Sequence, residues 1–122
     1  MGTFQVELEI GDPQGERWEK LQGTVGTKAA NAWVPQSVLE KLGVRVEKRV
    51  SLRHTDGRLI KRDVGQASLR IGDKSIVGTV VFGAERDPVL VGSETLQAMQ
   101  LQADLSREQI VPTAGLPEKA TG

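Results

Sequence analysis

Apolar and polar residues alternate strictly at the start of this 122-residue chain. The apolar positions are Phe4, Val6, Leu8 and Ile10, and the residues between them are Gln5, Glu7 and Glu9. Successive side chains of a strand point to opposite faces, so this period of two predicts a half-buried β-strand. Gly, Asp and Pro within 11–15 then predict a turn. A helix would scatter these apolar side chains around its surface, so the pattern directs the chain toward a β fold.

A second alternating region predicts a β-meander over 44–82. Its first strand carries Val44, Val46, Val50 and Leu52 on one face, with charged residues on the other. Asp56-Gly57 predicts a tight type I′ hairpin turn, because both central residues of that turn adopt positive φ. A return strand over 58–71, a turn at 72–74 and a third strand over 75–82 complete the meander.

The remaining segments predict short strands and short helices. Strands are expected over 20–25, 32–34, 88–92, 101–105 and 109–112, with a loop at 26–31. Helices are expected over 37–42, ended by Gly43, and after Ser93. Residues 113–122 have little to bury, which predicts a flexible tail after one domain over 1–112. The expected class is all-β with one or two short helices.

Composition excludes several kinds of chemistry. The chain has no cysteine and one histidine, so we expect no disulfide, metal site or cofactor. The 16 basic and 16 acidic residues cancel, so net charge does not favour nucleic-acid binding. The apolar run 76–82 is far shorter than the roughly 20 residues that cross a bilayer. The first residues lack the basic and apolar regions of a secretion signal, so we expect a cytoplasmic protein without membrane contact.

Motifs in a fixed order then give the chain a family resemblance. They are Ala32-Trp33-Val34-Pro35, Asp56-Gly57-Arg58, Val81-Phe82-Gly83, Leu90-Val91-Gly92-Ser93 and Ile110-Val111-Pro112. With them, about the first 112 residues resemble the small bacterial clan AA aspartic proteases, which are single-domain relatives of retroviral proteases. The resemblance implies a retropepsin-like acid-protease β barrel that pairs as a homodimer. It also implies an extended peptide as the ligand.

The family's catalytic motif, an apolar residue followed by Asp-Thr-Gly-Ala, aligns with 25–29. Gly26 replaces the catalytic aspartate and Lys28 replaces the motif glycine, whereas Thr27 and Ala29 match. In the family, each chain of a homodimer supplies one of two carboxylates that share a proton. One substitution therefore removes both carboxylates. We predict no catalytic residue in this chain and a protease activity close to nil.

The resemblance also implies which residues bind substrate. The loop would contribute Gly26, Thr27, Lys28 and Ala29, and the flap hairpin would contribute His54, Thr55, Asp56 and Gly57. The turn already explains Asp56, and the other candidate acids, Asp12, Asp87 and Asp104, lie in turns or at strand ends. None is expected to replace the missing aspartate.

For three residues, a purely structural role is considered beside a functional one. Thr27 would hydrogen-bond across the dimer or within its own loop. Trp33, in an apolar strand, is expected in the core rather than on a stacking platform. His54 is expected in a solvated turn rather than as a pH switch.

Residues 45–62 contain seven basic and two acidic residues, a local excess of five positive charges. Such a hairpin can lie along phosphates. No aromatic residue for base stacking lies among these charges, so a solvated hairpin is favoured. The favoured function is an inactive, homodimeric peptide-binding or scaffold protein. The alternatives are an active aspartic endopeptidase that uses an unrecognised acid, and an anion- or nucleic-acid-binding module.

Overall fold

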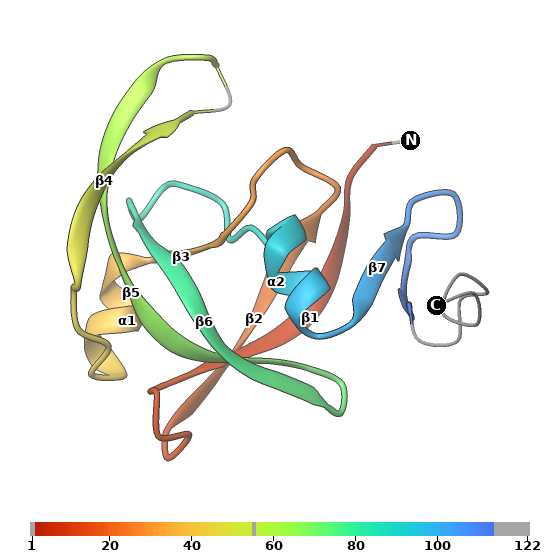
Figure 1. Cartoon of the computed structure of the whole chain (residues 1–122), viewed down its shortest axis with the longest axis horizontal. Coiled ribbons are helices and arrows are strands. Elements are labelled where there is room, and N and C mark those ends of the chain that lie inside the picture. Colours follow the sequence, from red (N-terminus) through yellow and green to blue (C-terminus); the bar gives the residue numbers. More distant parts are fainter. Residues whose placement is uncertain (1, 55, 114–122) are drawn as a thin grey trace, which may run out of the picture.

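The computed structural model describes residues 2–54 and 56–113, and within them the chain forms eight strands and two short helices (Figure 1). The strands are β1 (Phe4–Gly11), β2 (Trp18–Val25), β3 (Ala32–Pro35), β4 (Lys48–Arg53), β5 (Leu59–Ile71), β6 (Lys74–Gly83), β7 (Leu101–Asp104) and β8 (Gln109–Pro112). The helices are α1 (Gln36–Lys41) and α2 (Ser93–Ala98). The predicted all-β class with short helices is confirmed. Residues 114–122 of the predicted tail lie outside the described part of the chain.

Six strands form one sheet in the order β2-β1-β5-β6-β3, with β4 paired to β5. All pairs are antiparallel except β3 with β6. The long strand β5 belongs to two parts of the molecule: its first half pairs with β4 as a projecting hairpin, and its second half pairs with β1. Strands β7 and β8 form a separate two-stranded sheet. Figure 1 shows the hairpin and this small sheet on opposite sides of the molecule.

The segment 89–91 joins the two ends of the large sheet. Leu90 bridges to Thr24 in parallel and to Trp33 in antiparallel orientation. On the β2 side, Thr24 N donates to Val89 O (2.8 Å) and Val91 N donates to Thr24 O (2.9 Å). On the β3 side, Leu90 and Trp33 exchange two hydrogen bonds of 3.0 Å. The predicted barrel therefore closes only through this bridge, because the continuous ladder ends at β2 and β3.

The prediction of a strand over 88–92 is wrong in its length, because this segment makes only isolated bridges at Leu90. Its two neighbours run in opposite directions, and each contacts it over only a few residues. Pro88 has no N–H to extend the pairing. After Val91 the chain turns at Gly92 into α2.

Two clusters of buried side chains fill the space inside the sheet. The larger one includes Leu8, Ile10, Val25, Val34, Leu39, Leu69, Val80, Leu96 and Leu101. The smaller one consists of Trp33, Val64, Val81 and Leu90, and half-buried Ala29, Val50, Leu52 and Ile60 pack against it. Trp33 is 8% exposed, so its predicted place in the core is confirmed. The smaller cluster connects the base of the hairpin to the loop 26–31.

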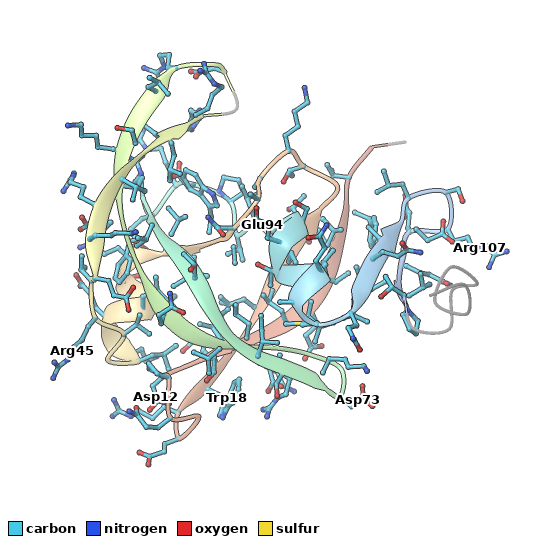
Figure 2. The ribbon with its side chains drawn as sticks, in the orientation of Figure 1. Asp12, Trp18, Arg45, Asp73, Glu94 and Arg107 are labelled. Carbon is cyan, nitrogen blue, oxygen red and sulfur yellow. The ribbon has the colours of Figure 1, made fainter. Side chains whose placement is uncertain are left out.

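The predicted turn after β1 joins β1 to β2. Figure 2 shows Asp12 and Trp18 in this region of the molecule. Asp12 Oδ1 accepts hydrogen bonds from the backbone N–H groups of Glu16 (2.7 Å) and Arg17 (2.8 Å). The guanidinium of Arg70 lies 3.8 Å from the centre of the Trp18 ring and pairs with Glu9 at 2.7 Å. These contacts give Asp12 and Trp18 a structural role, away from the loop 26–31.

The two helices confirm the positions predicted for them. Helix α1 is anchored from a distant loop, because both the N–H (3.1 Å) and the hydroxyl (2.8 Å) of Ser37 donate to the Glu85 carboxylate. The first of these bonds satisfies the Ser37 N–H at the start of α1. No side chain of the helix itself caps this end. No helix of the described residues is long and apolar enough to span a membrane.

The strand predicted to begin at Val44 begins at Lys48. Val44 is buried, but Val46 is 50% exposed, so the two side chains do not share a face as predicted. Ahead of the strand, the Arg45 carbonyl lies so close to Gly65 that it would overlap a Cβ there. The chain therefore crosses β5 at this point, and Glu47 N donates to Val64 O (2.7 Å) just before the ladder starts.

Gly92 provides a test of the closure. A Cβ at this position would overlap the backbone of Ala30 and Asn31, although its φ of −79° suits any residue. We expect Gly92→Ala to lower the free energy of unfolding by about 3 kcal/mol, because backbone atoms have to move apart. Gly43→Ala is the control: its φ is +80° with open space around it, so conformational strain alone costs about 1–2 kcal/mol. Urea unfolding measures both, and an equal loss in the two variants would contradict the role of Gly92.

Candidate functional site

The loop 26–31 is fixed by the segment that closes the sheet. Ser93 N donates to Ala29 O (3.0 Å) and Glu94 N donates to Ala30 O (2.9 Å). Figure 2 shows Glu94 at the start of α2 beside this loop. The first N–H groups of α2 are thus satisfied by the loop itself, which ties the predicted motif to a rigid part of the fold.

Gly26 occupies the position that the resemblance assigns to the catalytic aspartate. Its φ is +96°, in the left-handed region that side chains rarely adopt. A Cβ at this position would lie 3.0 Å from Leu105 Cδ2 and 3.1 Å from Gly2 O. A side chain here would therefore point at the N-terminal segment and the β7–β8 turn, whereas the hairpin lies on the other side of the loop (Figure 1). Gly26 therefore offers no carboxylate, and its backbone disfavours any side chain.

The other loop residues make local contacts. Thr27 Oγ1 accepts a hydrogen bond from Ala29 N at 3.2 Å, which is the local alternative predicted for it. Lys28 is exposed, and none of the ion pairs of the described residues involves it. Ala29 packs against the smaller apolar cluster. Of the predicted loop residues, Ala29 is therefore the one that contacts the cluster shared with the hairpin.

The hairpin tip differs from the predicted type I′ turn. Gly57 has a φ of +93°. Gly57 N donates to His54 O (2.9 Å), and His54 N donates to Arg58 O (2.7 Å). This pattern is typical of a three-residue loop in which one turn is followed by a left-handed glycine. Thr55 lies outside the described residues.

Asp56 has the turn role predicted for it. Its Oδ1 accepts from Arg58 N (3.0 Å), its Oδ2 accepts from Arg58 Nε (2.8 Å), and His54 Nδ1 lies 3.5 Å from Oδ1. The Arg58 backbone N–H lowers the pKa of Asp56 most, and the Arg58 guanidinium and His54 lower it further against partial desolvation. A proton donor needs a raised pKa, so these contacts oppose a role as catalytic acid.

The hairpin and the loop 26–31, which carry the two predicted groups of binding residues, are linked through the smaller apolar cluster. The hydrogen bonds of Asp56 and Gly57 stay within the hairpin, and that of Thr27 stays within the loop. What joins the two elements is the smaller cluster, in which Ala29 and the half-buried Val50, Leu52 and Ile60 surround Trp33 and Leu90. The contact between the hairpin and the loop therefore runs through the apolar face of the hairpin.

A pocket of about 190 Å³ lies between the loop 26–31, α2 and β7. Its lining includes Gly26, Thr27, Leu96, Gln97, Leu101 and Gln102. Sequence reasoning missed this pocket, because it forms where the loop, α2 and β7 meet. No group of three or more metal-ligating side chains occurs in the part of the chain that the structure describes.

Sequence reasoning also missed Arg62, which it counted only as one charge of a basic hairpin. Arg62 lies directly opposite Val50, and its neighbours on the same face of β5 are Ile60 and Val64. Its Nη2 atom lies 3.7 Å from Asp87 Oδ2. The alternation of Ile60, Arg62 and Val64 was a signal for this placement, since residues two apart share a face.

Comparison with solved structures identifies the fold. The crystal structure of a retropepsin-like aspartic protease from Rickettsia conorii matches with a TM-score of 0.52 and 22% sequence identity. The match covers 84% of this chain and 77% of that protein. No protein-family profile matches the chain, and neither does any curated protein sequence. The chain has a retropepsin-like fold, as the sequence predicted.

The contacts of Asp56 predict how it titrates. Its lowered folded pKa means that the unfolded chain takes up the proton first, near pH 3.9. The stability that Asp56 contributes is therefore present above that pH and is lost as the pH falls through the folded pKa. We expect an NMR titration of its carboxyl carbon to give a midpoint below the ordinary value. In Arg58→Gln the midpoint should rise only partway, since the backbone donor remains. An ordinary or raised midpoint in the unaltered chain would reopen Asp56 as a proton donor.

Proposed function

We propose that this chain is a catalytically inactive relative of retropepsin-like aspartic endopeptidases that acts as a homodimeric peptide-binding protein. The observation that carries the proposal is Gly26, where the resemblance expects the catalytic aspartate. It has no carboxylate, and its φ of +96° disfavours any side chain.

The chemistry of the family depends on two carboxylates that hold one proton and one water between them. Loss of a single acid–base group typically lowers a rate by about 10²–10⁴, and this chain lacks both. Asp56 does not offer a substitute, because Arg58 holds it as a lowered-pKa carboxylate in the turn. Catalysis by this chain would require an acid from outside the loop.

Three features of the small β7–β8 sheet support pairing with a second copy. A two-stranded sheet is marginally stable alone, and among the described residues neither edge of this sheet has a further strand partner. Leu105, in its turn, is 39% exposed beside Gly26. The pocket between the loop, α2 and β7 opens next to both. A second chain that covers Leu105 and adds strands here would bury apolar surface and complete the backbone pairing.

The hairpin supports the binding of an extended peptide. Strand β4 pairs only with β5, so its other edge is free among the described residues. Val50, Leu52 and Ile60 are half-buried around the smaller cluster, which leaves part of each side chain available to a ligand. An extended peptide gains main-chain hydrogen bonds from such an edge and side-chain contacts from such a face. The anion-binding alternative is weaker, since Arg49 and Arg58 are already paired with Asp63 and Asp56.

The proposal predicts that the unaltered chain cleaves no peptide. A broad peptide library incubated from about pH 3 to about pH 8, beside an active aspartic protease, should stay intact. The Gly26→Asp, Lys28→Gly variant should also be silent, because the new side chain would lie against Leu105 and the N-terminal segment. Cleavage by the unaltered chain would contradict the proposal. Cleavage by the variant alone would show that only the carboxylates are missing, and would contradict the role given to the loop backbone.

The same preparations test the dimer by mass determination in solution. We expect twice the mass of one chain, and we expect Leu105→Glu to shift the protein toward the monomer by placing a charge in the interface. Leu59→Glu is the matched control, since Leu59 is 67% exposed at the far end of the hairpin. A monomer in the unaltered chain, or an equal effect of both variants, would refute this interface.

A further inference from the structure

We propose that Arg62 selects peptides with an acidic side chain, by pairing with that carboxylate on the apolar face of the hairpin. This face consists of Val50, Leu52, Ile60, Arg62 and Val64, and is called the inner face below. The inference rests on the proposed peptide binding and adds the chemical class of the ligand.

The register of the hairpin puts Arg62 among apolar side chains. Arg62 is opposite Val50, and the next pair on the same face is Leu52 with Ile60. Its neighbour Val64 belongs to the buried cluster with Trp33. Lys48, opposite Val64, begins the strand and is exposed. A guanidinium within an apolar, half-buried face is costly unless it has a partner.

The partners of Arg62 leave much of its guanidinium unused. Nη1 donates to the Lys61 carbonyl at 3.0 Å. Nη2 is 3.7 Å from Asp87 Oδ2, which is an ion pair beyond hydrogen-bond distance. Nε is buried and has no hydrogen-bond partner among the described residues. A guanidinium has five N–H donors, so one hydrogen bond and one long ion pair satisfy only part of it.

Asp87 is held in its own turn, at ion-pair distance from Arg62 but beyond hydrogen-bond distance. Its Oδ2, the same oxygen that faces Arg62, already accepts a hydrogen bond from Ala84 N at 2.9 Å. This bond holds Asp87 in its own turn, where its side chain is 17% exposed. The Arg62 side chain is 28% exposed, so it can still reach a ligand while its surroundings limit hydration.

A carboxylate fits these donors better than other peptide groups do. Two carboxylate oxygens match the planar fork of a guanidinium, and charge-assisted pairs are roughly twice as strong as neutral hydrogen bonds. Partial desolvation strengthens the pair further. The neighbouring apolar side chains suit the flanking residues of a peptide. They offer no stacking surface for a base, because Trp33 is 8% exposed.

The test uses blocked ten-residue peptides from a positional library, each made with an Asp or Glu and with the matching Asn or Gln. Calorimetry compares their affinities for the unaltered chain, Arg62→Gln and Arg49→Gln. Arg49 is the matched control, because it lies on the opposite face of the same hairpin and loses the same charge. We expect an acid-over-amide preference of about tenfold or more in the unaltered chain and in Arg49→Gln, and its loss in Arg62→Gln.

The outcomes separate this inference from the proposed function. If no peptide binds the folded, unaltered chain, the proposed peptide binding fails, and the role of Arg62 fails with it. If peptides bind with equal affinity for acid and amide, only the role of Arg62 is refuted. An equal loss of preference in both variants also refutes it, since net charge would then explain the selectivity. An acid-to-amide ratio near one in the unaltered chain refutes the role of Arg62 even if Arg62→Gln is unstable.

Discussion

The fold depends on a short stretch of backbone, 89–91, that hydrogen-bonds to β2 on one side and β3 on the other. This contact joins the two ends of the large sheet and places Gly92 against Ala30, where no side chain fits. From there the first N–H groups of α2 reach the carbonyls of Ala29 and Ala30. One crossing therefore closes the sheet, starts the helix and fixes the loop that the family resemblance makes functional.

That arrangement separates what the chain retains from what it lacks. The retropepsin-like fold, the hairpin and the anchored loop are retained, and they require only backbone pairing and apolar burial. Under the proposed function, catalysis would require a carboxylate at position 26 that is directed toward the ligand. Gly26 has no side chain, and a Cβ at this position would lie near Leu105 and Gly2. A fold and its chemistry depend on different residues, so the proposed function is compatible with the retropepsin-like fold.

Local patterns predicted most of the elements, whereas long-range contacts decided the rest. The alternation from Phe4 to Ile10, the hairpin around Asp56-Gly57 and the positions of both short helices could be derived from period and turn chemistry. Residues 44–47 could not, because they respond to the approach of Arg45 to Gly65, twenty residues away in sequence. The bridge at Leu90 and the contact of Leu105 with position 26 likewise join distant segments. Arg62 could have been placed on the inner face by alternation, but its incomplete pairing with Asp87 required the structure.

A crystal structure of the dimeric Gly26→Asp, Lys28→Gly variant tests most directly whether the loop backbone has departed from a catalytic form. We predict that residue 26 keeps positive φ and that its carboxylate lies against Leu105 and the N-terminal segment. The two carboxylates of the dimer would then not share a proton. A structure in which the two carboxylates meet across the two-fold axis, about 3 Å apart, would contradict this account. The unaltered chain would then lack only the catalytic aspartate side chains.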